Sequence, residues 1–150
     1  MKTIHIFTIL CFFSTLTMST TCEDNTDIEV SFVTIENRAD ETIYICSDFC
    51  EYGETLTPYR VLELFPSRLH KVEKGGNIQE ATFPEFLDSL HTFQLIIFKQ
   101  STMDKYSKEE LVEKNIFDKR YVLSLNHLAS MGFRIIYNGE SDIEQTDLQQ

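Results

Sequence analysis

Phe93-Gln94-Leu95-Ile96-Ile97-Phe98 is the stretch that decides the fold of this 150-residue chain. Its apolar residues follow one another without the period-two alternation of a half-buried strand. A strand that is apolar on both faces stands inside a sheet that is covered from both sides. We therefore expect this segment to be the centre of the hydrophobic core.

The segment before this stretch contains two weaker strand patterns. Residues 28–36 alternate between apolar and polar side chains, but the phase shifts at Val33, which predicts a bulge or a kink. Turn-forming residues follow at 37–40, and a second apolar run covers residues 42–46. This order predicts that the two strands form an antiparallel hairpin.

Two short helices are expected after the central stretch. Ser107 and Glu110 have the S-x-x-E spacing of a capping box, which predicts a helix over residues 108–115. Ser124 can cap a second helix of two turns, and Gly132 stands where a left-handed C-terminal cap is needed.

Strands at residues 120–123 and 133–137 complete the pattern. We expect a mainly β fold, at the margin of α+β, in which residues 28–138 form a single antiparallel, two-layer, β-sandwich-like domain. An immunoglobulin-like arrangement is one form that such a domain can take. Residues 139–150 are polar and acidic and predict a disordered tail.

The N-terminal segment has the features of an export signal. Lys2 precedes an apolar run over residues 4–18, which is shorter than the roughly 20 residues that span a membrane. Residues 1–21 are therefore predicted to be a signal peptide.

Cys22 is the candidate lipidation site. Residues 18–22, Met-Ser-Thr-Thr-Cys, resemble a bacterial lipobox, and acylation of Cys22 would anchor the chain in a membrane. Residues 22–27 then form an acidic tether. In Bacteroidota-type lipoproteins such an acidic run resembles a surface-export signal, and a plain solvated tether is the alternative. Ordinary cleavage near residues 19–21 would instead leave Cys22 as a free or disulfide-bonded thiol.

The charge of the chain excludes one class of partner. The net charge is −11, and it becomes −12 without residues 1–21, because Lys2 is the one charged side chain there. Such a surface repels phosphate backbones, so nucleic-acid binding is not expected.

Enzymatic motifs and metal ligands are also missing from the pattern. The histidines after Cys22 are His70, His91 and His127, which stand singly and form no zinc-binding pair. No glycine-rich phosphate loop, G-x-S-x-G elbow or H-E-x-x-H motif is present. We therefore expect no catalytic residues, no metal and no cofactor.

Cys46 and Cys50 are the candidate disulfide pair. Four residues of extended strand span about 13 Å, which is too far for a disulfide, so pairing requires a tight turn through residues 47–49. The C-x-x-x-C spacing is not that of a redox motif.

Several segments together resemble a family of uncharacterised Bacteroidota lipoproteins: residues 93–98, 106–110, 119–125 and 133–137. The resemblance implies a small exported protein of the cell envelope, anchored in the outer membrane and exposed at the cell surface. It carries no assigned activity and no catalytic residues.

A non-catalytic binding or interaction module is the expected function. The candidate surface combines Phe49, Tyr52, Leu56 and Tyr59, which are dense in a segment with little regular pattern. Its partner would be a protein, or a glycan stacked on Tyr52 and Tyr59. The alternatives are a secreted or periplasmic structural component without a ligand and, third, a small envelope enzyme.

Overall fold

The computed structural model describes residues 31–82 and 90–142. The predicted signal peptide, Cys22, the acidic tether and the start of the first predicted strand lie outside the described residues, as do residues 143–150 of the predicted tail.

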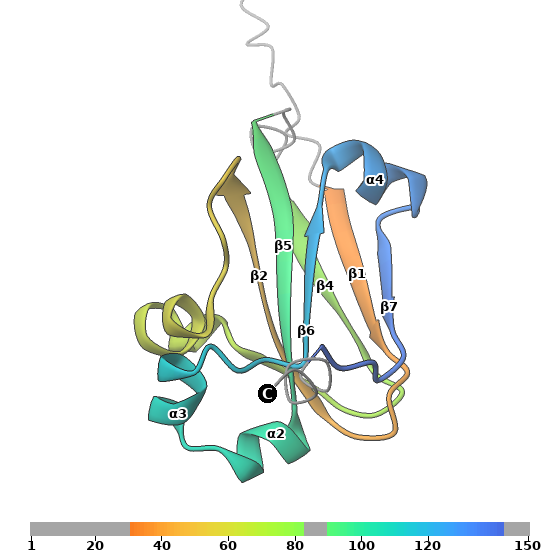
Figure 1. Ribbon diagram of the computed structural model, residues 1–150. Helices are drawn as coiled ribbons and strands as arrows, with labels where there is room; N and C mark the ends of the chain where they lie inside the picture. The colour runs from red at the N-terminus through yellow and green to blue at the C-terminus, as the bar shows by residue number, and fades with distance from the viewer. Residues whose placement is uncertain (1–30, 83–89, 143–150) are drawn as a thin grey trace, which may run out of the picture.

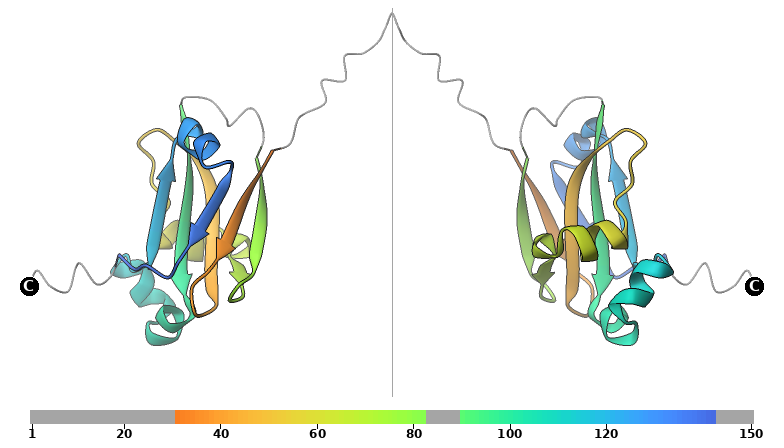
Figure 2. Two further views of the ribbon diagram at one scale, coloured as in Figure 1. Left: turned by 90° about the vertical axis from the view of Figure 1, so that its right-hand side faces the viewer. Right: turned by 90° about the vertical axis from the view of Figure 1, so that its left-hand side faces the viewer.

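Two β-sheets form the two layers of a sandwich (Figures 1 and 2). The three-stranded sheet has the order β4 (Asn77–Thr82), β1 (Ser31–Asn37), β7 (Arg134–Tyr137). The four-stranded sheet has the order β3 (His70–Val72), β2 (Ile43–Glu51), β5 (His91–Lys99), β6 (Lys119–Leu123). The predicted mainly β, two-layer fold is confirmed.

The pairing is antiparallel except at one edge. β7 runs parallel to β1, with Thr34 beside Arg134 and Asn37 beside Tyr137. Parallel neighbours need a long connection, and here the chain passes through the other sheet between β1 and β7. The immunoglobulin-like arrangement stays a prediction.

The predicted hairpin between the first two strands is wrong. β1 and β2 belong to different sheets, so the turn between them crosses from one layer to the other. The buried Asn37 side chain holds this crossing, because its Nδ2 donates to the backbone oxygens of Glu41 (2.9 Å) and Val72 (3.0 Å). Its Oδ1 accepts from the Ala39 amide at 3.0 Å. A side chain that bonds locally in this way ends the strand rather than closing a hairpin.

The predicted bulge is also absent from the described part of β1. Its register with β4 is continuous from Ser31 opposite Thr82 to Glu36 opposite Asn77. Val33 and Ile35 point into the core, whereas Phe32 is exposed.

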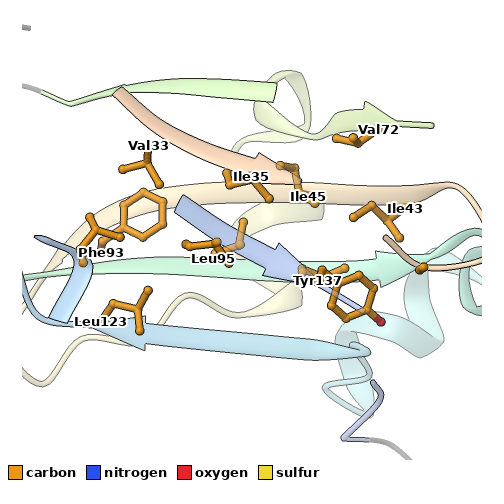
Figure 3. Close-up of a cluster of buried hydrophobic side chains, with 13 residues drawn as sticks. Val33, Ile35, Ile43, Ile45, Val72, Phe93, Leu95, Leu123 and Tyr137 are labelled. Atoms are coloured by element: carbon orange, nitrogen blue, oxygen red, sulfur yellow. The ribbon is translucent and has the colours of Figure 1, made fainter. Parts of the chain in front are cut away.

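The main core lies between the sheets (Figure 3). Phe93, Leu95 and Ile97 of β5 point into it, and Ile96 and Phe98 point to the opposite face. Each of these five side chains is buried, which confirms that β5 is covered on both sides. The core consists of Val33, Ile35, Ala39, Ile43, Ile45, Val72, Phe93, Leu95, Ile97, Leu123, Leu128, Ile135 and Tyr137.

A second apolar cluster lies on the outer face of the four-stranded sheet. It consists of Cys46, Cys50, Leu56, Val61, Leu62, Ile96, Phe98 and Leu111. The cover over it comes from the short helices η1 (Arg60–Leu64), η2 (Pro66–Arg68), α2 (Gln100–Lys105) and α3 (Lys108–Glu113). α3 matches the helix expected over residues 108–115, whereas η1, η2, α2 and strand β4 were not predicted from the sequence.

Both helix caps are confirmed. Ser107 Oγ accepts from the Glu110 amide, and the Glu110 carboxylate accepts from the Ser107 amide, so the capping box of α3 is complete. Ser124 Oγ accepts from the His127 amide at the start of α4 (Leu125–Ser130). Gly132 follows α4 with a φ of 63°, the left-handed conformation that glycine adopts at no steric cost.

The folded domain extends four residues further than predicted. The Asp142 amide donates to the Asp118 backbone oxygen, and Ser141 Oγ donates to the Asp118 carboxylate. Lys119 Nζ lies 2.7 Å from the Asp142 carboxylate. The start of the predicted tail is therefore attached to the end of the domain where β6 begins.

Candidate interaction site

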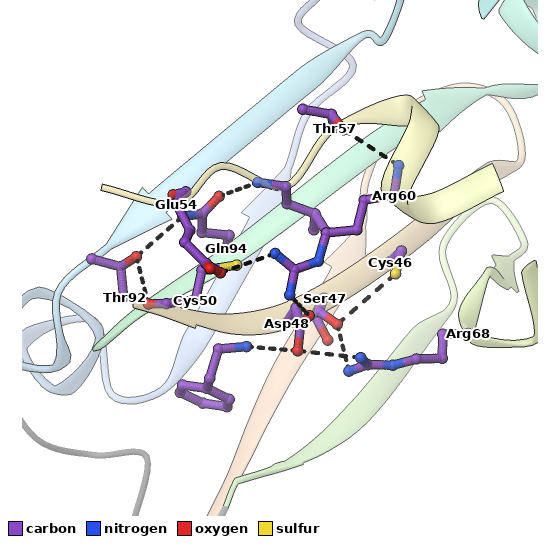
Figure 4. Close-up of polar contacts among 12 residues, drawn as sticks. Cys46, Ser47, Asp48, Cys50, Glu54, Thr57, Arg60, Arg68, Thr92 and Gln94 are labelled. Carbon is purple, nitrogen blue, oxygen red and sulfur yellow. Dashed lines mark hydrogen bonds and ion pairs between the residues drawn. The ribbon is translucent and has the colours of Figure 1, made fainter. Parts of the chain in front are cut away.

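A covering segment, residues 52–68, runs across the outer face of the four-stranded sheet. Gln94 fixes it there although Gln94 itself belongs to β5 and is buried. Its Oε1 accepts from the Leu56 amide at 2.7 Å, and its Nε2 donates to the Glu54 backbone oxygen at 2.7 Å (Figure 4). A buried side-chain amide whose oxygen and nitrogen are both hydrogen-bonded holds a loop in one position. Breaking these bonds would leave two buried backbone groups without partners.

Two arginines fasten the covering segment at a second place (Figure 4). Arg60 lies 3.4 Å from the Asp48 carboxylate and 3.0 Å from Glu54. Arg68 lies 3.2 Å from the same Asp48 carboxylate and also donates to the Ser47 backbone oxygen. β3 pairs with β2 over residues 43–45, and Arg68 occupies the edge of β2 just beyond that pairing.

Cys46 and Cys50 are free thiols, so the candidate disulfide does not form in this structure. Both lie on the single strand β2, where residues 47–49 remain paired with β5 and make no turn. Burial raises the pKa of Cys46 to about 11 and also raises the pKa of Cys50. Both groups are therefore held as unreactive thiols within the second cluster.

An apolar groove opens where the covering segment meets the α2–α3 helix pair. It is lined by Leu62, Pro66, Met103, Tyr106, Lys108 and Leu111, and its volume is about 330 Å³. Figure 1 shows why these residues meet: the covering helices lie next to α3, beside the lower half of β2, and Lys108 is paired with Glu63. The volume is at the lower end of the range for ligand sites and suits one or two side chains of a partner.

Charged side chains lie beside the groove. Lys108 Nζ lies 3.2 Å from the Glu63 carboxylate and links α3 to η1. Lys105 Nζ lies 4.8 Å from the centre of the Tyr106 ring. Leu64 and Phe65 continue from the groove-lining part of η1 and are exposed. An apolar floor with a polar rim is the usual anatomy of a protein-binding site.

The structure separates the four residues of the predicted interaction surface. Phe49 packs against the main core and its ring meets Phe93 edge to face at 5.3 Å. Leu56 is fully buried in the second cluster, so it forms no surface, and Phe49 is half-buried. Tyr52 and Tyr59 are exposed, but Tyr52 follows the end of β2 whereas Tyr59 directly precedes η1.

Sequence reasoning missed the groove because its two walls are about 40 residues apart in the chain. Leu62, Leu64, Phe65 and Pro66 form a dense apolar run that has neither helix nor strand periodicity. This dense apolar run was the feature of the sequence that could have indicated the groove. It indicates an apolar surface, but it does not predict the α2–α3 helix pair that forms the opposite wall.

The described residues offer no cluster of metal ligands. They contain no group of three or more His, Cys, Asp or Glu side chains that could hold a metal ion. A polar hollow of about 230 Å³ lies beside α2, between Lys99, Thr102 and Asp118. The Asp118 carboxylate there already accepts from the Lys99 amide and from Ser141, which gives it a structural role.

Comparisons with protein families, with curated proteins and with solved structures found no match to this chain. The resemblance to Bacteroidota lipoproteins therefore stays a prediction. Within residues 31–82 and 90–142, no helix has the length and apolar character that crossing a membrane requires.

Proposed function

We propose that this protein is an exported, membrane-anchored, non-catalytic module that binds an apolar segment of another protein in the groove between η1–η2 and α2–α3. The observation that carries the proposal is the groove itself, with Leu62, Met103 and Leu111 in its wall and floor. Leu64 and Phe65, which stand between the groove-lining Leu62 and Pro66 in the chain, are exposed.

Two further features support a binding role. The groove is built on a fastened scaffold, since Gln94, Arg60 and Arg68 tie the covering segment to the sheet. A rigid site loses little entropy on binding, which favours affinity for a small contact area. The two thiols of the cluster beneath are buried and protonated, which fits a non-catalytic role.

The binding half of the proposal is tested by site-specific photo-crosslinking in the cells that produce the protein. We expect p-azidophenylalanine at position 106, in the groove, to yield a discrete protein adduct. The same probe at position 79, on the exposed face of β4, is the matched control and should yield none. Met103→Glu, which places a charge in the groove wall, should abolish the adduct at position 106.

Three results would contradict groove binding. They are the absence of any adduct at position 106, the same adduct at positions 106 and 79, and an adduct at position 106 that Met103→Glu leaves unchanged.

The anchoring half is supported by the apolar run, the lipobox resemblance and the acidic residues after Cys22. Cys22→Ser should move the protein from the membrane fraction to the soluble fraction, because the acylated side chain is the anchor. Cys11→Ser changes a cysteine within the predicted leader and should leave the fractionation unchanged. A Cys22→Ser protein that still sediments with membranes would refute the anchor.

A further inference from the structure

The groove is narrow in the state that the structure describes. Leu62 of η1 and Leu111 of α3 line it from opposite walls, yet Leu62 is 5% exposed and Leu111 is 1% exposed. Binding gains free energy in proportion to the apolar area that leaves water, and a side chain that is already buried offers a partner little such area. The two walls must therefore separate before a partner segment can cover these side chains.

The two walls are attached to the sheet at different places. Arg60 and Arg68 tie the two ends of the η1–η2 wall to Asp48 of β2 (Figure 4). The α2–α3 wall begins at Gln100, directly after β5, and Gln100 Oε1 accepts from the Tyr44 hydroxyl at 2.7 Å. Because neither attachment joins one wall to the other, the walls can separate without losing these bonds.

An ion pair joins the two walls beside the groove. Lys108, the first residue of α3 and part of the groove lining, places its Nζ 3.2 Å from the carboxylate of Glu63 in η1. The Lys108 side chain is 49% exposed and that of Glu63 is 40% exposed, so water and salt weaken their attraction. Exposed pairs of this kind shift an equilibrium by about five-fold at most. This contact is strong enough to bias the width of the groove and weak enough for a partner to break.

The wall that carries Glu63 is the less regular one. η1 is a five-residue π-helix without a side-chain cap, in which the Phe65 amide donates to the Arg60 backbone oxygen at 3.1 Å. π-helical turns are rare and occur mostly at functional sites. α3, by contrast, begins with a complete capping box. We therefore expect the span between Arg60 and Arg68 to move when the groove opens, while α3 stays in place.

We propose that the Lys108–Glu63 ion pair is a latch that holds the groove closed, and that an apolar partner segment binds after this pair separates. The inference rests on groove binding, which is the proposed function, and adds its regulation. A protein whose binding-competent state is only partly populated binds with an affinity reduced by that fraction. Higher ionic strength, which screens the pair, should therefore strengthen partner binding, whereas it would weaken an ordinary charged contact with a partner.

Thiol reactivity in the groove wall measures opening without a partner. Leu62→Cys places a thiol at a nearly buried, groove-lining position of the full chain, purified from cells that export it. The chain without this substitution supplies the background rate. We expect a water-soluble maleimide to label position 62 about two- to five-fold faster when Lys108→Glu turns the attraction into repulsion. Exchanging both charges, Glu63→Lys with Lys108→Glu, should return the rate to its original value.

Two controls separate opening of the groove from loss of the fold. Lys114→Glu removes the pair with Glu110, which lies within α3 and does not join the walls, and it should leave the labelling rate unchanged. Cys46 and Cys50 lie beneath the same cover and should stay unlabelled in every variant. Lys108→Glu is itself compatible with α3, because a carboxylate in the first turn of a helix is favourable.

Three labelling results would overturn the latch. They are a rate at position 62 that Lys108→Glu leaves unchanged, an accelerated rate that the exchanged pair does not restore, and equally fast labelling of Cys46 or Cys50, because the whole cover would then be lifting.

The crosslinking at position 106 tests the proposed function separately. An adduct that increases in Lys108→Glu and falls back in the exchanged pair would support both groove binding and its regulation. An adduct that stays the same in these variants would overturn the regulation alone. A missing adduct would refute groove binding and leave the opening measured at position 62 in place.

Discussion

The outer faces of the two sheets are built in opposite ways. On the four-stranded sheet, Cys46, Ile96 and Phe98 point outward and are completely covered by short helices. On the three-stranded sheet, the outward positions include Gln79 and Arg134, which face solvent without a covering layer.

This contrast indicates where a site can arise in such a fold. A bare polar face offers a flat surface, whereas a covered face requires several chain segments to lie side by side. The groove is the place where two of those segments, η1–η2 and α2–α3, fail to close completely. The second layer of cover therefore creates the candidate site as a by-product of burying the sheet.

The largest expected effect comes from placing a carboxylate on each outer face. Ile96→Asp would bury an unpaired charge in the second cluster and should destabilise the fold by about 4 kcal/mol or more. Thr34→Asp, on the outer face of β1, should change the free energy of unfolding by less than about 0.5 kcal/mol. Urea unfolding monitored by circular dichroism measures the free energy of unfolding of both variants. Equal losses of stability would contradict the difference between the two outer faces.

Removing the Gln94 hydrogen bonds to the covering segment should have an intermediate effect on the free energy of unfolding. Gln94→Ala would leave the Leu56 amide and the Glu54 backbone oxygen without partners and should cost about 2 kcal/mol. Gln79→Ala, on the open face, is the control and should be nearly neutral. Hydrogen exchange at the Leu56 amide should accelerate in Gln94→Ala alone. Unchanged exchange there would show that Gln94 does not hold the covering segment.

The buried thiol predicts a weaker, pH-dependent effect. Burial raises the pKa of Cys46 to about 11, above its value of about 8.5 in an unfolded chain. The unfolded state therefore loses this proton first, and the stability that the neutral thiol contributes is lost as pH rises from about 8.5 to 11. Melting temperatures should fall less steeply over this range in Cys46→Ala. Parallel pH profiles for the two proteins would contradict the assignment.

The smallest effect is expected on the open face. Side-chain hydrogen bonds from Arg38 and Arg134 hold the pKa of Glu36 below its usual range. Because the folded-state pKa is the lower one, this stabilisation is present near neutral pH and is lost as pH falls below the unfolded value. Glu36→Gln should slightly flatten the acid side of the stability profile. A loss of stability as large as that of Gln94→Ala would show that the side chains of the open face contribute substantially to the fold.

Several local features could be predicted from sequence because they depend on near neighbours. The capping box of Ser107 and Glu110 joins residues three apart, and the Ser124 cap is equally local. The two-sided burial of β5 follows from its unbroken apolar run. The four residues of the predicted surface do not come together: Tyr52 and Tyr59 are exposed, Phe49 is half-buried against the main core, and Leu56 is buried.

Local sequence patterns specify a mainly β domain with a strand covered on both sides, two capped helices and an acidic composition. Period, capping and charge are properties of adjacent residues, so they can be read without a fold. Three features are visible only in the folded chain: β1 and β2 belong to different sheets, β7 pairs parallel with β1, and Leu62 and Leu111 line one groove. These outcomes depend on which distant segments pack together, and many pairings satisfy the same local pattern.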